Sequence, residues 1–371
     1  MFGLHIRRVT RVAIALAAVA LLAGACATTD SGGGGGGGGG EKVIALLLPE
    51  TKTARYEAAD RPLFEAKVKA LCADCRIIYS NADQKADEQQ NQADAALTNG
   101  AKVMVLDPVD SASAASIVSK AKAQSVPVIS YDRLITGADV DYYISFDNEK
   151  VGKLQAESLV SKLKEDGESS GNLVMINGAP TDNNAKLFKE GAHSVLDGSG
   201  FKIGKEYDTP DWSPDKAQDE MDQAITALGK NGFVGVYAAN DGTGGGAIAA
   251  MKGAGIDPSS RPTTGQDAEL AAIQRILTGE QYMTVYKAIK PEAEKAAELA
   301  VSLINGDRAA ADALATAKVN NGQKDVASIL LDPVAVTKDN IKDTIIADNF
   351  HPVAQICAGA AASACQAAGI S

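Results

Sequence analysis

Apolar and polar positions along residues 43–347 follow a pattern that switches between two periods. Short runs of consecutive apolar residues, such as 43–48 and 103–106, predict strands that are buried on both faces. Segments between such runs, such as 61–71 and 184–196, carry apolar residues at helical spacing and predict amphipathic helices. Repeated strand–helix units of this size predict parallel sheets of the doubly wound α/β class.

The strand–helix rhythm occurs twice along the chain, which predicts two lobes of similar fold. The elements after residue 284 are too few for a third domain, so we expect them to complete the two sheets. The chain would then cross between the lobes more than once. The predicted division is a first lobe of 43–145 plus 286–325, a second lobe of 146–285 plus 326–350, and an Ala- and Gly-rich tail, 351–371.

The chain opens with a positively charged segment followed by an apolar stretch of small residues. This order is typical of a secretory signal, predicted over 1–25, and the stretch is too short for a membrane span. Its removal takes away three arginines and no acidic residue, so the formal net charge changes from −11 to −14. An acidic body argues against nucleic acid as a partner. The three arginines are Arg7, Arg8 and Arg11.

Small residues stand directly before a lone cysteine at the end of this signal. Residues 22–26 read LAGAC and resemble a bacterial lipobox, although Ala23 stands where Leu is usual. We therefore expect Cys26 to be lipidated, with plain secretion or a periplasmic location as the alternative. Nine glycines follow, ending at residue 40, so 26–42 is predicted to be a flexible tether at the outer face of the cell membrane.

Four further cysteines lie in the body of the chain, an even number that favours disulfides in an exported protein. The natural pairing is local, Cys72 with Cys75 and Cys357 with Cys365. The CADC motif at 72–75 could instead be a redox pair or half of a zinc site. Its place after a predicted helix does not match a thioredoxin-like turn, and no second CxxC motif or histidine pair accompanies it.

Polar, charged and aromatic side chains follow nearly every predicted strand, at the edge where open parallel sheets bind ligands. Arg and Asp can pair with neighbouring hydroxyls, Asn can both donate and accept, and aromatic rings can cover the apolar faces of a sugar ring. The sequence therefore predicts a site for a small polyhydroxylated ligand. The strand-end residues are Arg55, Tyr56, Tyr131, Asp132, Arg133, Asp182, Asn183, Asn184, Asp211, Trp212, Asn240, Asp241, Gln266, Asp267 and Lys287.

Six segments carry a resemblance to a known family. The chain resembles the type I periplasmic sugar-binding proteins of bacterial ABC importers, in particular the D-xylose-binding group, over about residues 43–350. The segments are YDRLITGADVDYYISFDNEKVGKLQAE at 131–157, PTDNNAKLF at 180–188, AANDGTGGGAI at 238–248, TGQDAEL at 264–270, MTVYK at 283–287 and NNGQKDV at 320–326.

The resemblance implies two Rossmann-like lobes joined by three crossovers, with a monosaccharide such as D-xylose held between them. It also implies a monomer that needs no cofactor or metal and delivers its ligand to an ABC permease. The family has Trp where this chain has Tyr56, which affects affinity or sugar range. The implied sugar contacts are Arg55, Asp132, Arg133, Asp182, Asn184, Asn240, Asp267 and Lys287, with Tyr56 and Trp212 stacking on the ring.

Several other interpretations of these residues remain. DGTGGGA at 241–247 fits a dinucleotide fingerprint, but its place in the second lobe and the preceding Asn240 suit a sugar better. The polar run 182–186 could be a simple helix cap and turn. No Ser-His-Asp order or metal cluster is visible in the sequence, so we do not expect an enzyme. A sugar sensor that presents its ligand to a receptor is the alternative to a transport protein, and another pentose or a hexose is the alternative ligand.

Overall fold

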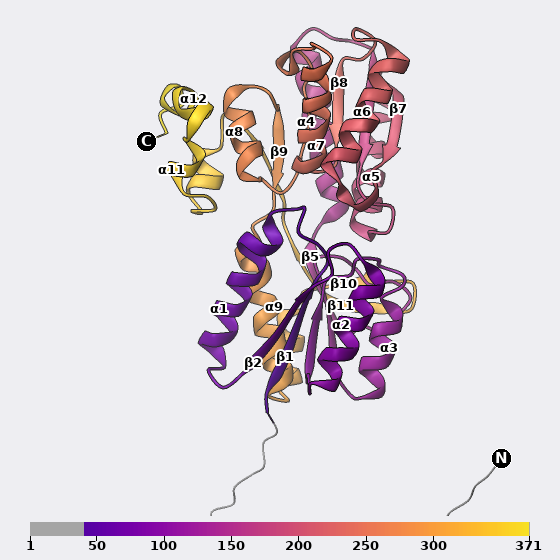
Figure 1. Cartoon of the computed structure of the whole chain (residues 1–371), viewed down its shortest axis with the longest axis vertical. Helices are drawn as coiled ribbons and strands as arrows, with labels where there is room; N and C mark the ends of the chain where they lie inside the picture. Colours follow the sequence, from indigo (N-terminus) through magenta and orange to yellow (C-terminus); the bar gives the residue numbers. More distant parts are fainter. Residues whose placement is uncertain (1–40, 371) are drawn as a thin grey trace, which may run out of the picture. The chain divides into compact units, whose positions relative to one another are not determined.

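Residues 41–370, which the computed structural model describes, carry three β-sheets with helices packed against them (Figure 1). The predicted signal over 1–25, Cys26 and the glycine run lie outside the described residues. None of the helices within 41–370 has the length and apolar character that crossing a bilayer requires. The prediction of a lipid anchor at Cys26 therefore stays a prediction.

The first sheet contains seven strands in the order β10-β11-β5-β4-β3-β1-β2, all parallel except β10. Its strands are β1 (Val43–Leu48), β2 (Arg76–Asn81), β3 (Val103–Leu106), β4 (Val128–Tyr131), β5 (Tyr142–Phe146), β10 (Ala317–Asn320) and β11 (Asp325–Leu331). Its helices are α1 (Arg61–Leu71), α2 (Ala86–Thr98), α3 (Ala115–Ala123), α9 (Ile289–Ile304) and α10 (Arg308–Leu314). Successive side chains of β1 point to opposite faces. Ile44 and Leu46 therefore pack with α1 and α9, whereas Ala45 and Leu47 pack with α2 and α3.

The second group of strands combines a parallel sheet, β7-β6-β8, with an antiparallel pair, β9 and β12. Its strands are β6 (Asn172–Asn177), β7 (Lys202–Asp208), β8 (Gly235–Ala238), β9 (Met283–Tyr286) and β12 (Val334–Thr337). Its helices are α4 (Asn148–Glu165), α5 (Asn183–Leu196), α6 (Pro214–Leu228), α7 (Asp241–Gly253) and α8 (Leu270–Thr278). Single parallel bridges, Val236 to Thr263 and Gln266 to Val285, connect the sheet to the pair. The second group therefore forms one continuous layer.

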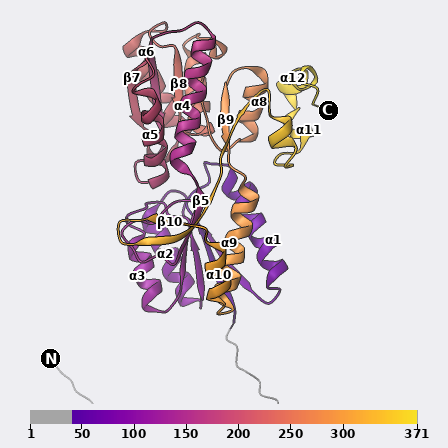
Figure 2. The same cartoon turned by 180° about the vertical axis from the view of Figure 1, so that it is seen from behind.

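The chain passes between the two groups of strands at three places, after β5, after β9 and after β11 (Figures 1 and 2). The last place differs from the predicted boundary, which put 326–350 in the second lobe. Strand β11 pairs with β5 in the first sheet, with Ile329 opposite Ile144, so the crossing comes after Leu331. An apolar strand carries no local mark of the sheet that it joins, which is why the sequence misplaced this boundary.

The tail 351–370 packs onto the second group of strands. Its short helices, α11 (Val353–Ile356) and α12 (Ala362–Ala367), lie beside α8 in both views (Figures 1 and 2). Ile356 and Cys365 are buried in one apolar cluster with Ile273 and Leu277 of α8. The disulfide Cys357–Cys365 closes the tail on itself. The tail is thus part of a folded core.

The second predicted disulfide, Cys72–Cys75, is also present and joins the end of α1 to the start of β2. A carboxylate oxygen of Asp74 and the two sulfurs lie within 4.8 Å of one another. They form the one group of potential metal ligands found among the described residues. Asp74 is instead paired with Lys42, 3.2 Å away, next to the first residue of β1. This arrangement agrees with the structural interpretation of the CADC motif.

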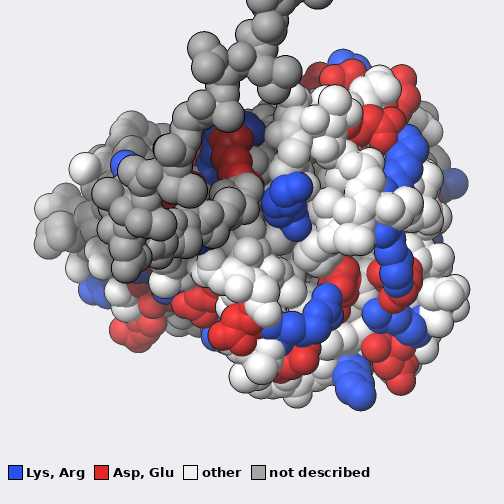
Figure 3. Space-filling model, turned by 90° about the horizontal axis from the view of Figure 1, so that it is seen from below, with Lys and Arg blue, Asp and Glu red and all other residues white. Residues whose placement is uncertain are grey.

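Charged side chains of both signs are mixed on the face of the molecule seen from below (Figure 3). Elsewhere near the first sheet, exposed side chains form ion pairs such as Lys120 with Asp94, 2.7 Å apart, and Arg76 with Glu41, 2.5 Å apart. Exposed pairs of this kind contribute little to stability, about 0–1 kcal/mol each. The visible face therefore offers no broad positive surface of the kind that nucleic acid requires.

Candidate functional site

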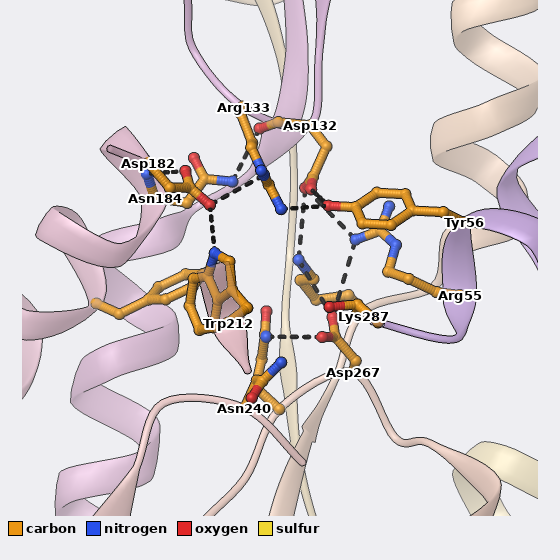
Figure 4. Close-up of a pocket in the computed structure, with 13 residues that line it drawn as sticks. Arg55, Tyr56, Asp132, Arg133, Asp182, Asn184, Trp212, Asn240, Asp267 and Lys287 are labelled. Carbon is orange, nitrogen blue, oxygen red and sulfur yellow. Dashed lines mark hydrogen bonds and ion pairs between the residues drawn. The ribbon is translucent and has the colours of Figure 1, made fainter. Parts of the chain in front are cut away.

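The carboxyl ends of the strands in both groups meet at one small cavity with an empty volume of about 260 Å³. All ten residues predicted to contact the ligand line this cavity (Figure 4). They are Arg55, Tyr56, Asp132, Arg133, Asp182, Asn184, Trp212, Asn240, Asp267 and Lys287. Three further lining residues were not predicted as contacts, namely Thr53, Phe188 and Gln266.

Arg55 lies after β1 and is held in place by two buried carboxylates behind the cavity. Its Nε and Nη2 donate to Asp60 at 2.9 and 2.6 Å, and Nη2 also donates to Glu292 at 2.6 Å. Its remaining nitrogen, Nη1, lies 3.4 Å from the Asp132 carboxylate at the cavity. A guanidinium fixed on two sides presents its last donors in one orientation. Burial raises the pKa of Glu292, although Arg55 opposes that shift.

Asp132 stands at the centre of the first lobe's contribution, directly after β4. Its carboxylate accepts from the Tyr56 hydroxyl at 3.1 Å and from Lys287 Nζ at 3.4 Å. Burial opposes ionisation, but Arg55, Lys287 and Arg133 outweigh burial and lower the pKa of Asp132 below its usual range. Asp132 is therefore an anionic acceptor that can bond ligand hydroxyls.

Arg133 reaches across the cavity to the second group of strands. Its Nε lies 3.0 Å from the Asp182 carboxylate, and its Nη2 donates to the Tyr56 hydroxyl at 3.2 Å. The Tyr56 hydroxyl thus accepts from Arg133 and donates to Asp132. A tryptophan at this position could only donate, since its indole N–H is not an acceptor. Tyr56 therefore joins two charged groups of the cavity in a way that a tryptophan could not.

Asp182 has two functions, because it caps helix α5 and also lines the cavity. One carboxylate oxygen accepts from the backbone N–H of Asn184 at 2.8 Å, the usual bond of a helix N-cap. The other accepts from Trp212 Nε1 at 3.1 Å (Figure 4). Burial raises the pKa of Asp182, while Arg133 pulls it down. Asp182 therefore caps helix α5, as the turn interpretation predicted, and it also lines the cavity.

Trp212 forms an apolar wall of the cavity and is only 4% exposed. Its ring lies against the backbone at Gly178, where a Cβ would come 2.0 Å from the indole. Phe188 packs against it edge-on, with ring centroids 6.3 Å apart. Phe188 was not predicted as a lining residue, since an apolar residue inside a helix is expected in the core. The two rings supply an apolar face beside the charged groups.

Asp267 and Asn240 complete the site from strand ends of the second group. Asp267 Oδ2 accepts from Gln266 Nε2 at 3.0 Å. Its buried Oδ1 has no hydrogen-bond donor within 41–370, although Lys287 Nζ lies 3.5 Å away. A buried carboxylate oxygen left in this state can accept a hydrogen bond from a ligand. Asn240 caps helix α7 through its side-chain oxygen, which accepts from the N–H of Thr243 at 2.9 Å.

The side chains that line the cavity carry three positive and three negative charges. The positive and negative charges of the cavity lining are therefore equal in number. Planar polar groups lie beside aromatic rings in the same lining. Such a cavity can bind a neutral ring with hydroxyl groups on its edge and C–H groups on its faces. The charged residues are Arg55, Arg133, Lys287, Asp132, Asp182 and Asp267.

Comparison with known proteins agrees with this geometry. The chain is 41% identical over 312 residues to the D-xylose-binding periplasmic protein of Haemophilus influenzae, covering 83% of this chain and 90% of that protein. It is 39% identical over 317 residues to the D-xylose-binding periplasmic protein of Escherichia coli, covering 84% and 92%. Both relatives are named as binding proteins, in agreement with the prediction that the chain is not an enzyme.

A solved structure shows the same fold. The crystal structure of an ABC transporter solute binding protein from Clostridium phytofermentans with bound β-D-glucose superposes with a TM-score of 0.77 at 28% identity, covering 85% of this chain and all of that one. The predicted fold class is thereby confirmed, as is the family resemblance carried by the six motifs. A profile of the family described as "Periplasmic binding protein domain" matches residues 44–308, and the chain belongs to that family.

Proposed function

We propose that this chain is the extracytoplasmic solute-binding protein of an ABC sugar importer, with D-xylose as its ligand. The observation that carries the proposal is the convergence of ten strand-end residues on one charge-balanced cavity with aromatic walls. The names of the relatives from Haemophilus influenzae and Escherichia coli support D-xylose as the first sugar to test. A glucose-bound structural relative favours a hexose as the second candidate.

The proposed mechanism is closure of the two lobes around the sugar. The first lobe supplies Arg55 and Asp132, the second supplies Asp182 and Asp267, and Lys287 lies where the chain crosses between them. A sugar that bonds to both sets of residues stabilises the closed arrangement, because the open arrangement can satisfy only one set. The closed form would then be recognised by the membrane permease.

The residue roles follow from the contacts at the cavity. Asp132, Asp182 and Asp267 would accept hydrogen bonds from sugar hydroxyls, while Arg55 and Lys287 would donate. Asn184 and Asn240 would do both, and Arg133 would donate from its position between Tyr56 and Asp182. Trp212 and Tyr56 would cover the two faces of the ring. The residues assigned to this site are the ten that line the cavity and were predicted from the strand ends.

Calorimetric titration of the purified protein with pentoses and hexoses tests which sugar it binds. We expect heat with D-xylose, and weaker or no heat with sugars that differ at one hydroxyl, because an unpaired buried polar group costs about 1–3 kcal/mol. Absence of heat with every monosaccharide would contradict the sugar assignment. Heat with D-glucose alone would replace the pentose with a hexose.

We further propose that a lipid on Cys26 anchors the protein to the outer face of the cell membrane. The lipobox-like LAGAC segment and the glycine run after it support this proposal. Fractionation of cells that produce the full chain and its Cys26→Ala variant tests it. The unaltered chain should sediment with membranes, whereas the variant should appear in the soluble exported fraction. Identical distribution of the two chains would contradict lipidation.

A further inference from the structure

The loop that carries Asp267 into the cavity has an unusual backbone. Asp267 has φ of 92° and Ala268 has φ of 53°, both in the region that favours glycine. Residues other than glycine are strained in this region and persist there only where their surroundings hold them in place. Bonds from β9 supply part of that support, since Asp267 N–H donates to Val285 O at 2.9 Å and Ala268 N–H donates to Thr284 Oγ1 at 3.2 Å.

The carbonyl side of this loop is supported from the C-terminal tail. His351 Nε2 donates to the backbone oxygen of Ala268 at 2.8 Å. The acceptor fixes the tautomer, because a carbonyl oxygen can only accept, so the proton must sit on Nε2. Burial lowers the pKa of His351, with the bond to Ala268 opposing that shift. The imidazole is therefore a neutral donor near neutral pH.

The same short segment of the tail also contacts the strand end that carries Lys287. The hydroxyl of Tyr286, the residue before Lys287, donates to Asp348 at 3.0 Å. The Phe350 ring packs against Tyr286 with centroids 5.0 Å apart and against His351 with centroids 4.6 Å apart. The segment 348–351, at the start of the tail, thus touches the neighbours of two cavity residues.

The two cavity residues, Asp267 and Lys287, lie next to each other. Lys287 Nζ lies 3.5 Å from Asp267 Oδ1, the oxygen that has no hydrogen-bond donor within the described residues. A shift of either strand end would change that distance and the direction in which the oxygen accepts. The tail segment lies beyond residues 44–308, where the family profile matches.

We infer that His351 is a positioning residue for the sugar site, through which the C-terminal tail holds Asp267 in its binding orientation. The inference rests on the proposed sugar-binding function. It adds a part of the chain outside the matched family domain to the binding machinery. His351 does not line the cavity, so its effect on affinity passes entirely through the loop 266–269.

Calorimetric titration of His351→Leu and His351→Gln with D-xylose tests the inference. His351→Leu removes the N–H donor and leaves an apolar side chain in its place. We expect about five- to tenfold weaker binding, which corresponds to the loss of one hydrogen bond. His351→Gln keeps an N–H donor and should recover most of the affinity. The matched control is His193→Leu, at the other histidine within 41–370, which bonds Asp197 and Glu206 on the surface and should leave affinity unchanged.

A double-mutant cycle separates positioning from general support. In the Asp267→Asn background the loss from His351→Leu should shrink to less than about twofold, because the residue through which it acts has already been altered. Thermal unfolding without sugar checks that each variant is folded. If His351→Leu does not fold, His351→Phe, which keeps an aromatic ring but has no N–H donor, replaces it, and the same five- to tenfold weaker binding is expected.

Three results would overturn the inference. The first is unchanged affinity in His351→Leu, or in His351→Phe where that variant replaces it. The second is an equal loss in both backgrounds with no recovery in His351→Gln, which would make the role of His351 purely structural. The third is the absence of binding by the unaltered chain, and this result alone also removes the proposed function.

Discussion

Ser111 joins the two lobes on one side of the cavity without lining it, and its hydroxyl offers a test of lobe closure. The hydroxyl oxygen accepts from the backbone N–H of Asn183 at 3.1 Å, and the Ser111 N–H donates to Thr181 O at 3.0 Å. Asn183 and Thr181 belong to the second lobe. The substitution Ser111→Ala removes the first bond and keeps the second.

The expected effect can be worked out from that one bond. A hydrogen bond of this kind contributes about 1 kcal/mol net, and it exists only when the lobes are closed. Its loss should shift the closure equilibrium by about fivefold toward the open form. Because Ser111 does not line the cavity, the affinity for every bound sugar should fall by the same factor. The change should appear mainly in the dissociation rate, since the bond forms after the sugar has entered.

Fluorescence of Trp212 provides the assay, because it is the one tryptophan of the chain and lies in the cavity wall. Stopped-flow mixing with two different sugars gives both rate constants for the unaltered chain and for Ser111→Ala. The control is Ser113→Ala, an exposed serine of the same loop, which should change neither rate. Unchanged dissociation in Ser111→Ala, or a factor that differs between the two sugars, would refute the reasoning.

Three more predictions concern the site and its supports. Asp182→Asn keeps one oxygen to cap helix α5 but puts an NH2 group in place of the other oxygen, the acceptor of Trp212 and the partner of Arg133, and removes the charge, so calorimetry should show affinity lower by tenfold or more, about 1.5–3 kcal/mol; unchanged affinity would remove Asp182 from the site. Burial raises the pKa of Asp241 to about 7, with Arg275 opposing, so the folded state holds this proton more tightly than the unfolded state, whose pKa is about 3.9. The contribution of Asp241 to stability should therefore be greatest below about pH 4 and fall as pH rises toward about 7, by at most about 1.4 kcal/mol per pH unit, and denaturant titration of Asp241→Asn should show a pH profile without this fall; an equal fall of stability with pH in both chains would contradict this assignment. Replacing Cys357 and Cys365 together by Ser should lower the free energy of unfolding by about 2–3 kcal/mol, measured in denaturant, whereas no loss would show that the disulfide does not support the tail.

The strand-end pattern predicted the site residues as candidates, because ligands of parallel sheets bind beyond the carboxyl ends of the strands. Asp132 directly follows β4 of the first sheet, and Asp182 comes five residues after β6 of the second sheet; that these two residues share one site was predicted by the family resemblance. Glu292 carries no such signal. It lies in helix α9, 237 residues from Arg55, and only the packing of α9 against the first sheet makes it a partner of that guanidinium.

The fold class was equally visible, but the pairing of late elements was not. Strand β11 has the same apolar pattern whether it joins the first sheet or the second, and its partner β5 lies almost two hundred residues earlier. The contribution of His351 was also hidden, because the sequence showed no partner at ligand spacing and its partner is a backbone oxygen. Long-range pairings and contacts to the main chain leave no periodic mark in a sequence.

The cavity is lined by equal numbers of positive and negative side chains, and this balance disfavours charged ligands. A neutral sugar enters without disturbing the balance, whereas a sugar acid would bring a fourth negative charge and find no partner for it. Buried charges are also screened little by dissolved salt. Under the proposed function, the affinity for a neutral sugar should therefore change little with salt concentration, and a uronic acid should bind more weakly than the corresponding neutral sugar.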